Sequence, residues 1–161
     1  MNQKIIVIGA GIVGLAISRE LLMRGYKDVT IIEKENQIAS HQSSRNSGVM
    51  HAGLYYKPGS LKAELSRSGI YKMKEYCRSR DIKFEECGKI VVAKNDAEID
   101  NLNNLYERGL ANKLKGIKKL KSKEILQREP YICAKNAILV PEESIVSYSD
   151  VAKNFLDDVR N

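Results

Sequence analysis

Apolar positions in the first part of the chain switch between a strand pattern and a helix pattern. Two short apolar runs, residues 4–8 and 29–32, fit buried strands, and residues 15–22 between them repeat apolar side chains at helical spacing before Gly25. Residues 4–33 therefore predict one βαβ unit with two parallel strands. Parallel strands are normally buried on both faces and rarely occur as an isolated pair, so the unit is expected to belong to a larger sheet.

Beyond this unit the pattern predicts a mixed succession of elements. Residues 34–59 show no convincing periodicity and are rich in serine, glycine and asparagine, which indicates a long functional loop. A helix is expected over residues 60–80, with Ser60 as N-cap and an apolar face of Leu61, Leu65, Met73, Tyr76 and Cys77. A second begins at an Asn95–Glu98 capping box and continues through Tyr106. Two more are expected over residues 122–129 and 148–159. The later expected strands are 82–86, 89–93 and 137–140.

These elements favour the α/β fold class, in which a Rossmann-type βαβ unit is followed by part of an α+β domain. Only two strands of a doubly wound sheet are present, and the later strands fit a different sheet. We therefore interpret the 161 residues as the N-terminal piece of a longer protein.

A glycine pattern lies where the first strand meets the helix. Gly9, Gly11 and Gly14 form G-x-G-x-x-G, and Glu33 follows the second strand. In this context Gly9 permits the tight turn, Gly11 lets a pyrophosphate approach the backbone, and Gly14 lets the helix pack on the strand. The helix start favours phosphate, and Glu33 would accept hydrogen bonds from an adenosine ribose while repelling a 2′-phosphate. The pattern predicts NAD or FAD rather than NADP; the alternative is a glycine-rich turn without a ligand.

Composition narrows the class of protein. An apolar content of 43% is enough for a buried core. The separated cysteines Cys77, Cys87 and Cys133 argue against a disulfide framework or a zinc site and favour a reducing cytoplasm. The two histidines are too few for a metal cluster without other ligands, so no metal is predicted.

The net charge of +7 is concentrated in the lysine-rich stretch 113–123. A solvated face is the favoured interpretation, because no aromatic residues or arginines interleave these lysines. Contact with an anionic membrane surface and binding of nucleic acid are the alternatives.

The loop after Glu33 narrows the choice of cofactor. Residues 41–56 are dense in hydroxyl, amide and backbone donors and include the guanidinium of Arg45. Such a loop is suited to wrap a pyrophosphate and a ribityl chain, which a permanently held flavin needs more than NAD does.

With this loop, the sequence resembles the FAD-dependent oxidoreductases of the D-amino-acid oxidase superfamily, and within them most closely the L-2-hydroxyglutarate oxidase/dehydrogenase family. The most specific string is Arg45-Asn-Ser-Gly-Val-Met-His-Ala-Gly-Leu-Tyr-Tyr56. The other matching strings are the glycine motif with Glu33, 41–62, 87–93 and 140–146. The sequence departs from the family at Ser44, where glycine is usual, and at Ser18, where alanine is usual.

The resemblance implies a chain more than twice this length that oxidises L-2-hydroxyglutarate to 2-oxoglutarate. Hydride would pass from C2 to FAD, and the electrons would pass on to a membrane carrier or to oxygen. The implied cofactor-binding residues are Gly9, Gly11, Ile12, Val13 and Gly14 at the pyrophosphate, Glu33 and Lys34 at the adenosine, and Gln42, Ser43, Arg45, Asn46, Ser47 and Gly48 along the ribityl chain and flavin.

The candidate catalytic residue is His51. The resemblance places its His-Ala-Gly string beside the flavin, and oxidation of a hydroxy acid needs a base for the alcohol proton. The alternative is a histidine that only hydrogen-bonds backbone or flavin. Tyr55 is expected to pack and His41 to be a loop donor, whereas the cationic residues that clamp the dicarboxylate substrate are not identified in this sequence.

Under this interpretation residues 1–80 begin the FAD-binding domain, 81–147 are part of the substrate domain, and 148–161 form a helix that returns toward the FAD domain. The isolated chain is expected to be inactive. The expected location is the cytoplasm, with contact to the inner face of the membrane left open. Open alternatives for the function are another flavoenzyme of the superfamily that oxidises amines or glycerol 3-phosphate, an NAD-dependent dehydrogenase, and an inactive nucleotide-binding fragment.

Overall fold

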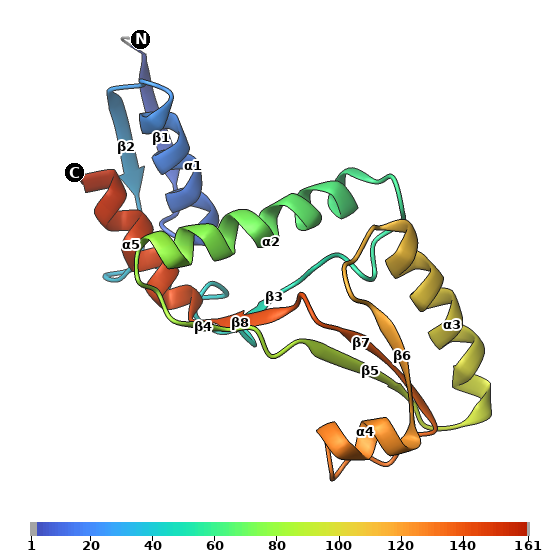
Figure 1. The fold of residues 1–161 in the computed structure, drawn as a ribbon. Helices are drawn as coiled ribbons and strands as arrows, with labels where there is room; N and C mark the ends of the chain where they lie inside the picture. The colour runs from blue at the N-terminus through green and yellow to red at the C-terminus, as the bar shows by residue number, and fades with distance from the viewer. Residues whose placement is uncertain (1–2, 161) are drawn as a thin grey trace. The chain divides into compact units, whose positions relative to one another are not determined.

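The computed structural model describes residues 3–160, which form two compact units. The first unit contains residues 3–48, 77–83 and 146–160, and the second contains 49–76 and 84–145. The helices are α1 (Ile12–Met23), α2 (Leu61–Ser79), α3 (Asp96–Ala111), α4 (Ser122–Arg128) and α5 (Tyr148–Arg160) (Figure 1). The strands are β1 (Lys4–Ile8), β2 (Asp28–Ile32), β3 (Val49–Met50), β4 (Phe84–Glu85), β5 (Lys89–Ala93), β6 (Lys118–Lys121), β7 (Asn136–Val140) and β8 (Ser144–Val146). Residues 49–76 thus group with 84–145, while the functional division into FAD and substrate domains stays a prediction.

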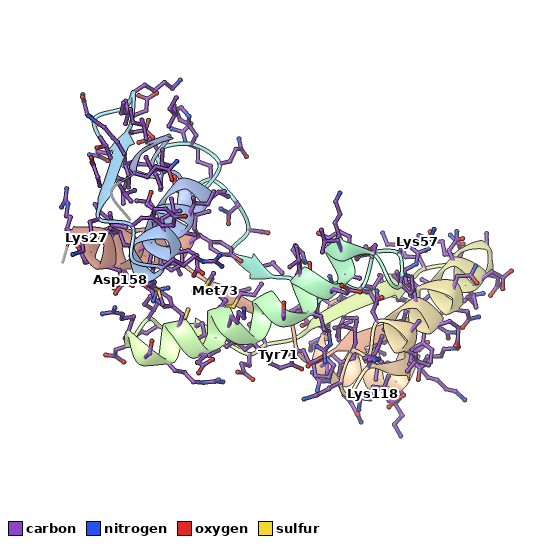
Figure 2. All side chains as sticks on the ribbon, turned by 90° about the horizontal axis from the view of Figure 1, so that it is seen from above. Lys27, Lys57, Tyr71, Met73, Lys118 and Asp158 are labelled. Atoms are coloured by element: carbon purple, nitrogen blue, oxygen red, sulfur yellow. The ribbon has the colours of Figure 1, made fainter. Side chains whose placement is uncertain are left out.

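The first unit contains the predicted βαβ unit. Strands β1 and β2 pair in parallel with Lys4 opposite Asp28, and α1 connects them. Helix α5 packs against α1 and is tied to it by an ion pair of 2.5 Å between Arg19 Nε and Asp158 Oδ2. Asp158 is labelled in Figure 2. The α/β fold class and its Rossmann-type start are therefore confirmed.

One face of the β1–β2 pair is apolar and exposed. The relative exposure is 53% for Ile6, 87% for Ile8 and 51% for Ile32. Alternate strand residues point to opposite faces, so these three isoleucines share the face that α1 does not cover. In the described part of the first unit this sheet thus has one exposed face and one half-buried face, contrary to the usual state of parallel strands.

The second unit is built on antiparallel strands. One sheet has the order β3-β8-β4 and the other β5-β7-β6, with Lys89 opposite Val140 and Lys118 opposite Leu139. Helix α4 contacts β6 and β7 (Figure 1). A buried cluster holds α4 on this sheet through Leu120, Ile125, Ala137 and Leu139.

Three short strands, β3, β6 and β8, were not predicted from the sequence. Strand β6 lies inside the lysine-rich stretch, where Leu120 is 2% exposed while the lysines beside it face solvent. The interpretation as a solvated face is therefore correct for the lysine side chains but missed the strand that carries them. Such lysines suit an edge strand, because their charge opposes pairing with another chain.

Helix α2 has nearly the predicted length, and its predicted apolar face is wrong at the first two leucines but right at Cys77, which is buried. Leu61 and Leu65 are 68% and 60% exposed. The buried stripe repeats every seventh residue, Ala63, Ile70 and Cys77, which is a helical repeat that the larger leucines hid. The predicted Ser60 cap is present, since its Oγ accepts from the Ala63 N–H at 3.3 Å.

The cap of α3 is only partly the predicted capping box. Asn95 Oδ1 accepts from the Glu98 N–H at 3.2 Å, as expected of an N-cap. The Glu98 carboxylate, however, accepts from the Lys94 N–H at 2.7 Å and from Asn95 Nδ2 at 3.2 Å, and not from the Asn95 backbone N–H that a capping box would use. Among the helices of residues 3–160, none combines the length and the hydropathy that crossing a membrane requires.

Candidate functional site: a dinucleotide loop and a histidine–carboxylate cluster

The glycine loop of the first unit has the geometry of a tight strand-to-helix turn. Gly9 has a φ of +100°, a conformation that side chains rarely adopt. A Cβ on Gly14 would collide with the Gly9 carbonyl oxygen and would lie 3.5 Å from Val7 Cγ1. The helix can therefore approach β1 this closely only with glycine at position 14. These positions agree with the predicted roles in the turn and in packing.

The start of α1 is capped by the loop that follows β2. Ser43 Oγ accepts from the Ile12 N–H at 3.0 Å, and a Cβ on Gly11 would lie 3.2 Å from the same oxygen. First-turn N–H groups of a helix have no partner inside the helix, and the helix dipole favours an acceptor or an anion there. The structure thus brings Gly11, Ile12 and Ser43 together where a pyrophosphate was predicted.

Glu33 closes the other side of this loop. Its Oε2 accepts from the Ala10 N–H at 2.7 Å and its Oε1 from the Glu35 N–H at 3.0 Å. The hydrogen bond from Glu35 and then that from Ala10 lower the pKa of the Glu33 carboxyl, because both stabilise the ionised form. A small cavity beside this carboxylate is lined by Gly11, Glu33, Glu35, Ala39, Ser40, His41 and Ser43.

The donor-rich loop is a set of tight turns. Asn46 Nδ2 donates to the Gln42 carbonyl at 2.8 Å, and Asn46 Oδ1 accepts from the Gly48 N–H at 2.8 Å. Gly48 has a φ of +71°, and a Cβ there would lie 2.6 Å from the Val146 carbonyl oxygen. The Val146 N–H donates to the Gly48 carbonyl at 2.9 Å, which ties this loop to the end of β8. The Arg45 side chain is exposed.

Both departures from the family pattern are accommodated. Ser44 is not among the residues of positive φ, and its Oγ donates to the His41 carbonyl at 3.2 Å. Ser18 is fully buried and its Oγ donates to the Gly14 carbonyl at 2.9 Å. A buried hydroxyl with a partner carries little cost, so Ser18 does not disturb the glycine loop, and Ser44 is exposed to solvent.

The other predicted cofactor residues lie on the surface of the first unit. The side chains of Val13, Lys34, Gln42 and Ser47 are all exposed. The first unit therefore holds every predicted cofactor residue on one loop–helix–loop assembly, while the candidate catalytic His51 belongs to the second unit.

In the second unit, His51 lies beside a buried carboxylate. Its Nδ1 is 3.4 Å from Glu143 Oε2, and the His51 side chain is 53% exposed whereas that of Glu143 is 1% exposed. Lys89 Nζ lies 2.7 Å from the same oxygen and 4.6 Å above the ring of Tyr55. His41, by contrast, belongs to the first unit, where its Nε2 lies 3.0 Å from Glu35 Oε1.

Sequence reasoning missed Glu143 and Lys89. Both lie in strings that carry the family resemblance, 140–146 and 87–93, but neither is near His51 in sequence. Only the antiparallel pairing of Val49 with Ile145 brings the carboxylate to the histidine. Within residues 3–160, no group of three or more histidine, cysteine, aspartate or glutamate side chains could hold a metal ion.

Comparison with known sequences identifies the family of this chain. A family model described as FAD dependent oxidoreductase matches residues 4–161. The chain is 49% identical over 156 residues to the mitochondrial L-2-hydroxyglutarate dehydrogenase of Dictyostelium discoideum, covering 95% of this chain and 35% of that protein. Against the enzyme of the same name from Escherichia coli (strain K12) it is 41% identical over 150 residues, covering 91% and 35%. The chain thus spans about a third of the length of these relatives.

Solved structures of oxidases share the fold of this chain. An L-α-glycerophosphate oxidase from Mycoplasma pneumoniae with FAD bound matches with a TM-score of 0.84 and 25% identity, covering 99% of this chain and 43% of that one. A glycine oxidase from Geobacillus kaustophilus matches with a TM-score of 0.84 and 27% identity, covering 98% and 44%. On its glycine loop, its fold and its family match, this chain belongs to the FAD-dependent oxidoreductase family.

Proposed function

We propose that this chain is the N-terminal part of a flavoenzyme that oxidises L-2-hydroxyglutarate to 2-oxoglutarate. The carrying observation is the identity of 41–49% to L-2-hydroxyglutarate dehydrogenases over more than nine-tenths of the chain. The exposed isoleucines of β1 and β2 support a longer protein, because further strands of the same sheet would bury them. The rest of the FAD domain and most of the substrate cavity would then lie in that further part.

The residues of the first unit fit FAD. The glycine loop leaves open space beside Gly9, where nothing lies within 4 Å of an added Cβ, and the start of α1 faces the same loop. Gly11, Ile12 and Ser43 would hold the pyrophosphate, and Glu33 would hold the ribose by exchanging one of its backbone donors. When bound, FAD supplies the acceptor for the hydride that leaves C2 of the substrate.

In this proposal His51 is the base. Its exposed imidazole would accept the proton of the substrate hydroxyl, as a general base within hydrogen-bond reach of the reacting group does. The substrate's two carboxylates would need cationic side chains to hold them. A membrane carrier or oxygen as electron acceptor, a cytoplasmic location and contact with the inner face of the membrane belong to the same proposal.

Anaerobic mixing of the full-length protein with candidate substrates tests the proposal. L-2-Hydroxyglutarate should bleach the visible absorbance of the bound flavin, whereas D-2-hydroxyglutarate is the matched control that should not. Bleaching by glycerol 3-phosphate or by an amine, with none by L-2-hydroxyglutarate, would leave the family assignment and reject this substrate.

A further inference from the structure

The buried carboxylate of Glu143 is the feature of the second unit that the proposed reaction does not yet use. Burying a carboxylate is costly unless charge and hydrogen bonds compensate it. Oε1 accepts from the Ala52 N–H at 3.3 Å. Oε2 lies at ion-pair distance from Lys89, 2.7 Å, yet Oε2 and Lys89 Nζ are buried without a hydrogen bond of ordinary geometry. Oε2 therefore has unused capacity to accept a hydrogen bond.

His51 is placed to use that capacity. Its Nδ1 lies 3.4 Å from Oε2, a separation that a small rotation of the ring would turn into a hydrogen bond. The two nitrogens of an imidazole point to different sides of the ring, so Nε2 is directed away from Glu143 when Nδ1 faces it. A neutral imidazole that donates from Nδ1 keeps its lone pair on Nε2.

The turn that carries Glu143 is fixed from outside by its neighbour. Glu142 accepts hydrogen bonds from Arg67 Nη1 at 2.7 Å, from the Lys115 N–H at 2.6 Å and from the Tyr71 hydroxyl, which lies on α2 (Figure 2). Lys74 Nζ donates to the Glu142 carbonyl at 2.8 Å. Glu142 therefore anchors the turn between β7 and β8 to α2, which fixes the backbone position from which Glu143 reaches inward.

We propose that Glu143 is a positioning residue that keeps the proton of neutral His51 on Nδ1 and so presents Nε2 as the proton acceptor. Lys89 balances the charge of the carboxylate, and its own place is fixed by the Tyr55 ring. This inference rests on the proposed role of His51 as base. A purely structural role, in which Glu143 only pairs with Lys89, predicts no effect on which nitrogen carries the histidine proton.

The direct test is the tautomer of His51 in the resting full-length protein. Nitrogen-15 chemical shifts of labelled histidine distinguish the two tautomers, and the His41→Gln and His51→Gln variants assign the two signals that come from this chain. Wild-type His51 should be protonated on Nδ1, and Glu143→Gln should shift it toward the Nε2-protonated form, because an amide can donate to Nδ1. The matched control is Glu35→Gln, which removes the carboxylate beside His41 and should leave the His51 signal unchanged.

The kinetic test separates positioning from folding. Glu143→Gln should lower the rate of flavin reduction by L-2-hydroxyglutarate by about 100-fold or more, with little change in KM. A loss of this size is typical when a general base is held in the wrong tautomer. Glu143→Asp keeps a carboxylate and should recover part of that rate. If Glu143→Gln is too unstable to purify, the double variant Lys89→Gln/Glu143→Gln removes both buried charges and should show the same change of tautomer.

The outcomes distinguish this inference from the proposed function. An unchanged His51 tautomer in a folded Glu143→Gln or double variant overturns the positioning role, whatever the substrate. A changed tautomer in a protein whose flavin is not bleached by L-2-hydroxyglutarate supports the positioning role and rejects that substrate. An unchanged rate of flavin reduction in Glu143→Gln would show that His51 needs no orienting carboxylate.

Discussion

Gly14 offers the sharpest test of the dinucleotide loop, because Gly69 is a matched control at which the same substitution should have the opposite effect. Both Gly14 in α1 and Gly69 in α2 are helical, where replacing glycine by alanine ordinarily stabilises a helix by about 1 kcal/mol. At Gly69 nothing lies within 4 Å of the added Cβ. At Gly14 the Cβ would collide with the Gly9 carbonyl oxygen, which is backbone and cannot rotate aside.

The two substitutions should therefore have effects of opposite sign. Gly69→Ala should raise the free energy of unfolding by about 0.5–1 kcal/mol. Gly14→Ala forces a backbone shift that costs about 1–3 kcal/mol, and the collision with backbone places it near the upper end, so the gain in helix propensity leaves a net loss of about 1–2 kcal/mol. The shift moves the turn at Gly9, so the affinity for FAD should fall as well.

Urea unfolding of the full-length protein without FAD measures the first effect, and quenching of FAD fluorescence on binding measures the second. Gly69→Ala serves as the control for both, since it changes a helix glycine without touching the loop. If Gly14→Ala proved as stable as Gly69→Ala and bound FAD like the wild type, close packing of α1 on β1 through Gly14 would be refuted.

Two further predictions concern titration and thiol chemistry. Burial raises the pKa of the Glu142 carboxyl, but the hydrogen bonds from Tyr71, the Lys115 N–H and Arg67 outweigh it and hold that pKa below its ordinary value of 4.5. The stabilisation of the protein by ionised Glu142 is therefore complete above that pH and is lost as the pH falls through the lower folded value. The difference in unfolding free energy between wild type and Glu142→Gln, measured in urea, should shrink in acid. A difference that stays constant with pH would contradict this hydrogen-bond network. Burial raises the pKa of the Cys77 thiol, whereas Cys87 and Cys133 are exposed. In native protein at neutral pH, a thiol reagent should therefore label Cys87 and Cys133 quickly and Cys77 only on unfolding. Equal labelling rates at all three cysteines would show that α2 opens readily.

The sequence was sufficient for the elements with strong local signals. Strand β1, helix α1 and strand β2 follow from apolar runs and from the punctuation of Gly9 and Gly25, both of which have positive φ. The short strands β3 and β8 could not be foreseen, because a strand of two or three residues has no readable period and is defined by its partner.

The candidate site likewise contains residues that the sequence could place and residues that it could not. Gly14 and Glu33 could be placed from spacing alone, since strand, turn and helix fix where their atoms lie. The proximity of Glu143 to His51 could not, because it depends on the pairing of residues far apart in sequence. The first half of the apolar face of α2 was misjudged for a related reason: residue size suggested Leu65, whereas tertiary packing selected Ala63 and Ile70.

The packing of α5 on α1 has a consequence for synthesis of the protein. Helix α1 ends at Met23, and the helix that covers it begins at Tyr148. At the usual speed of a ribosome the first helix waits roughly 6 to 25 s for its partner. During that interval the surface of α1 that α5 will cover is open to water, and the intervening residues of the second unit are made first. The nascent first unit is therefore a ready target for chaperones that bind apolar segments, and codon changes that slow translation between residues 49 and 145 should lower the yield of folded protein.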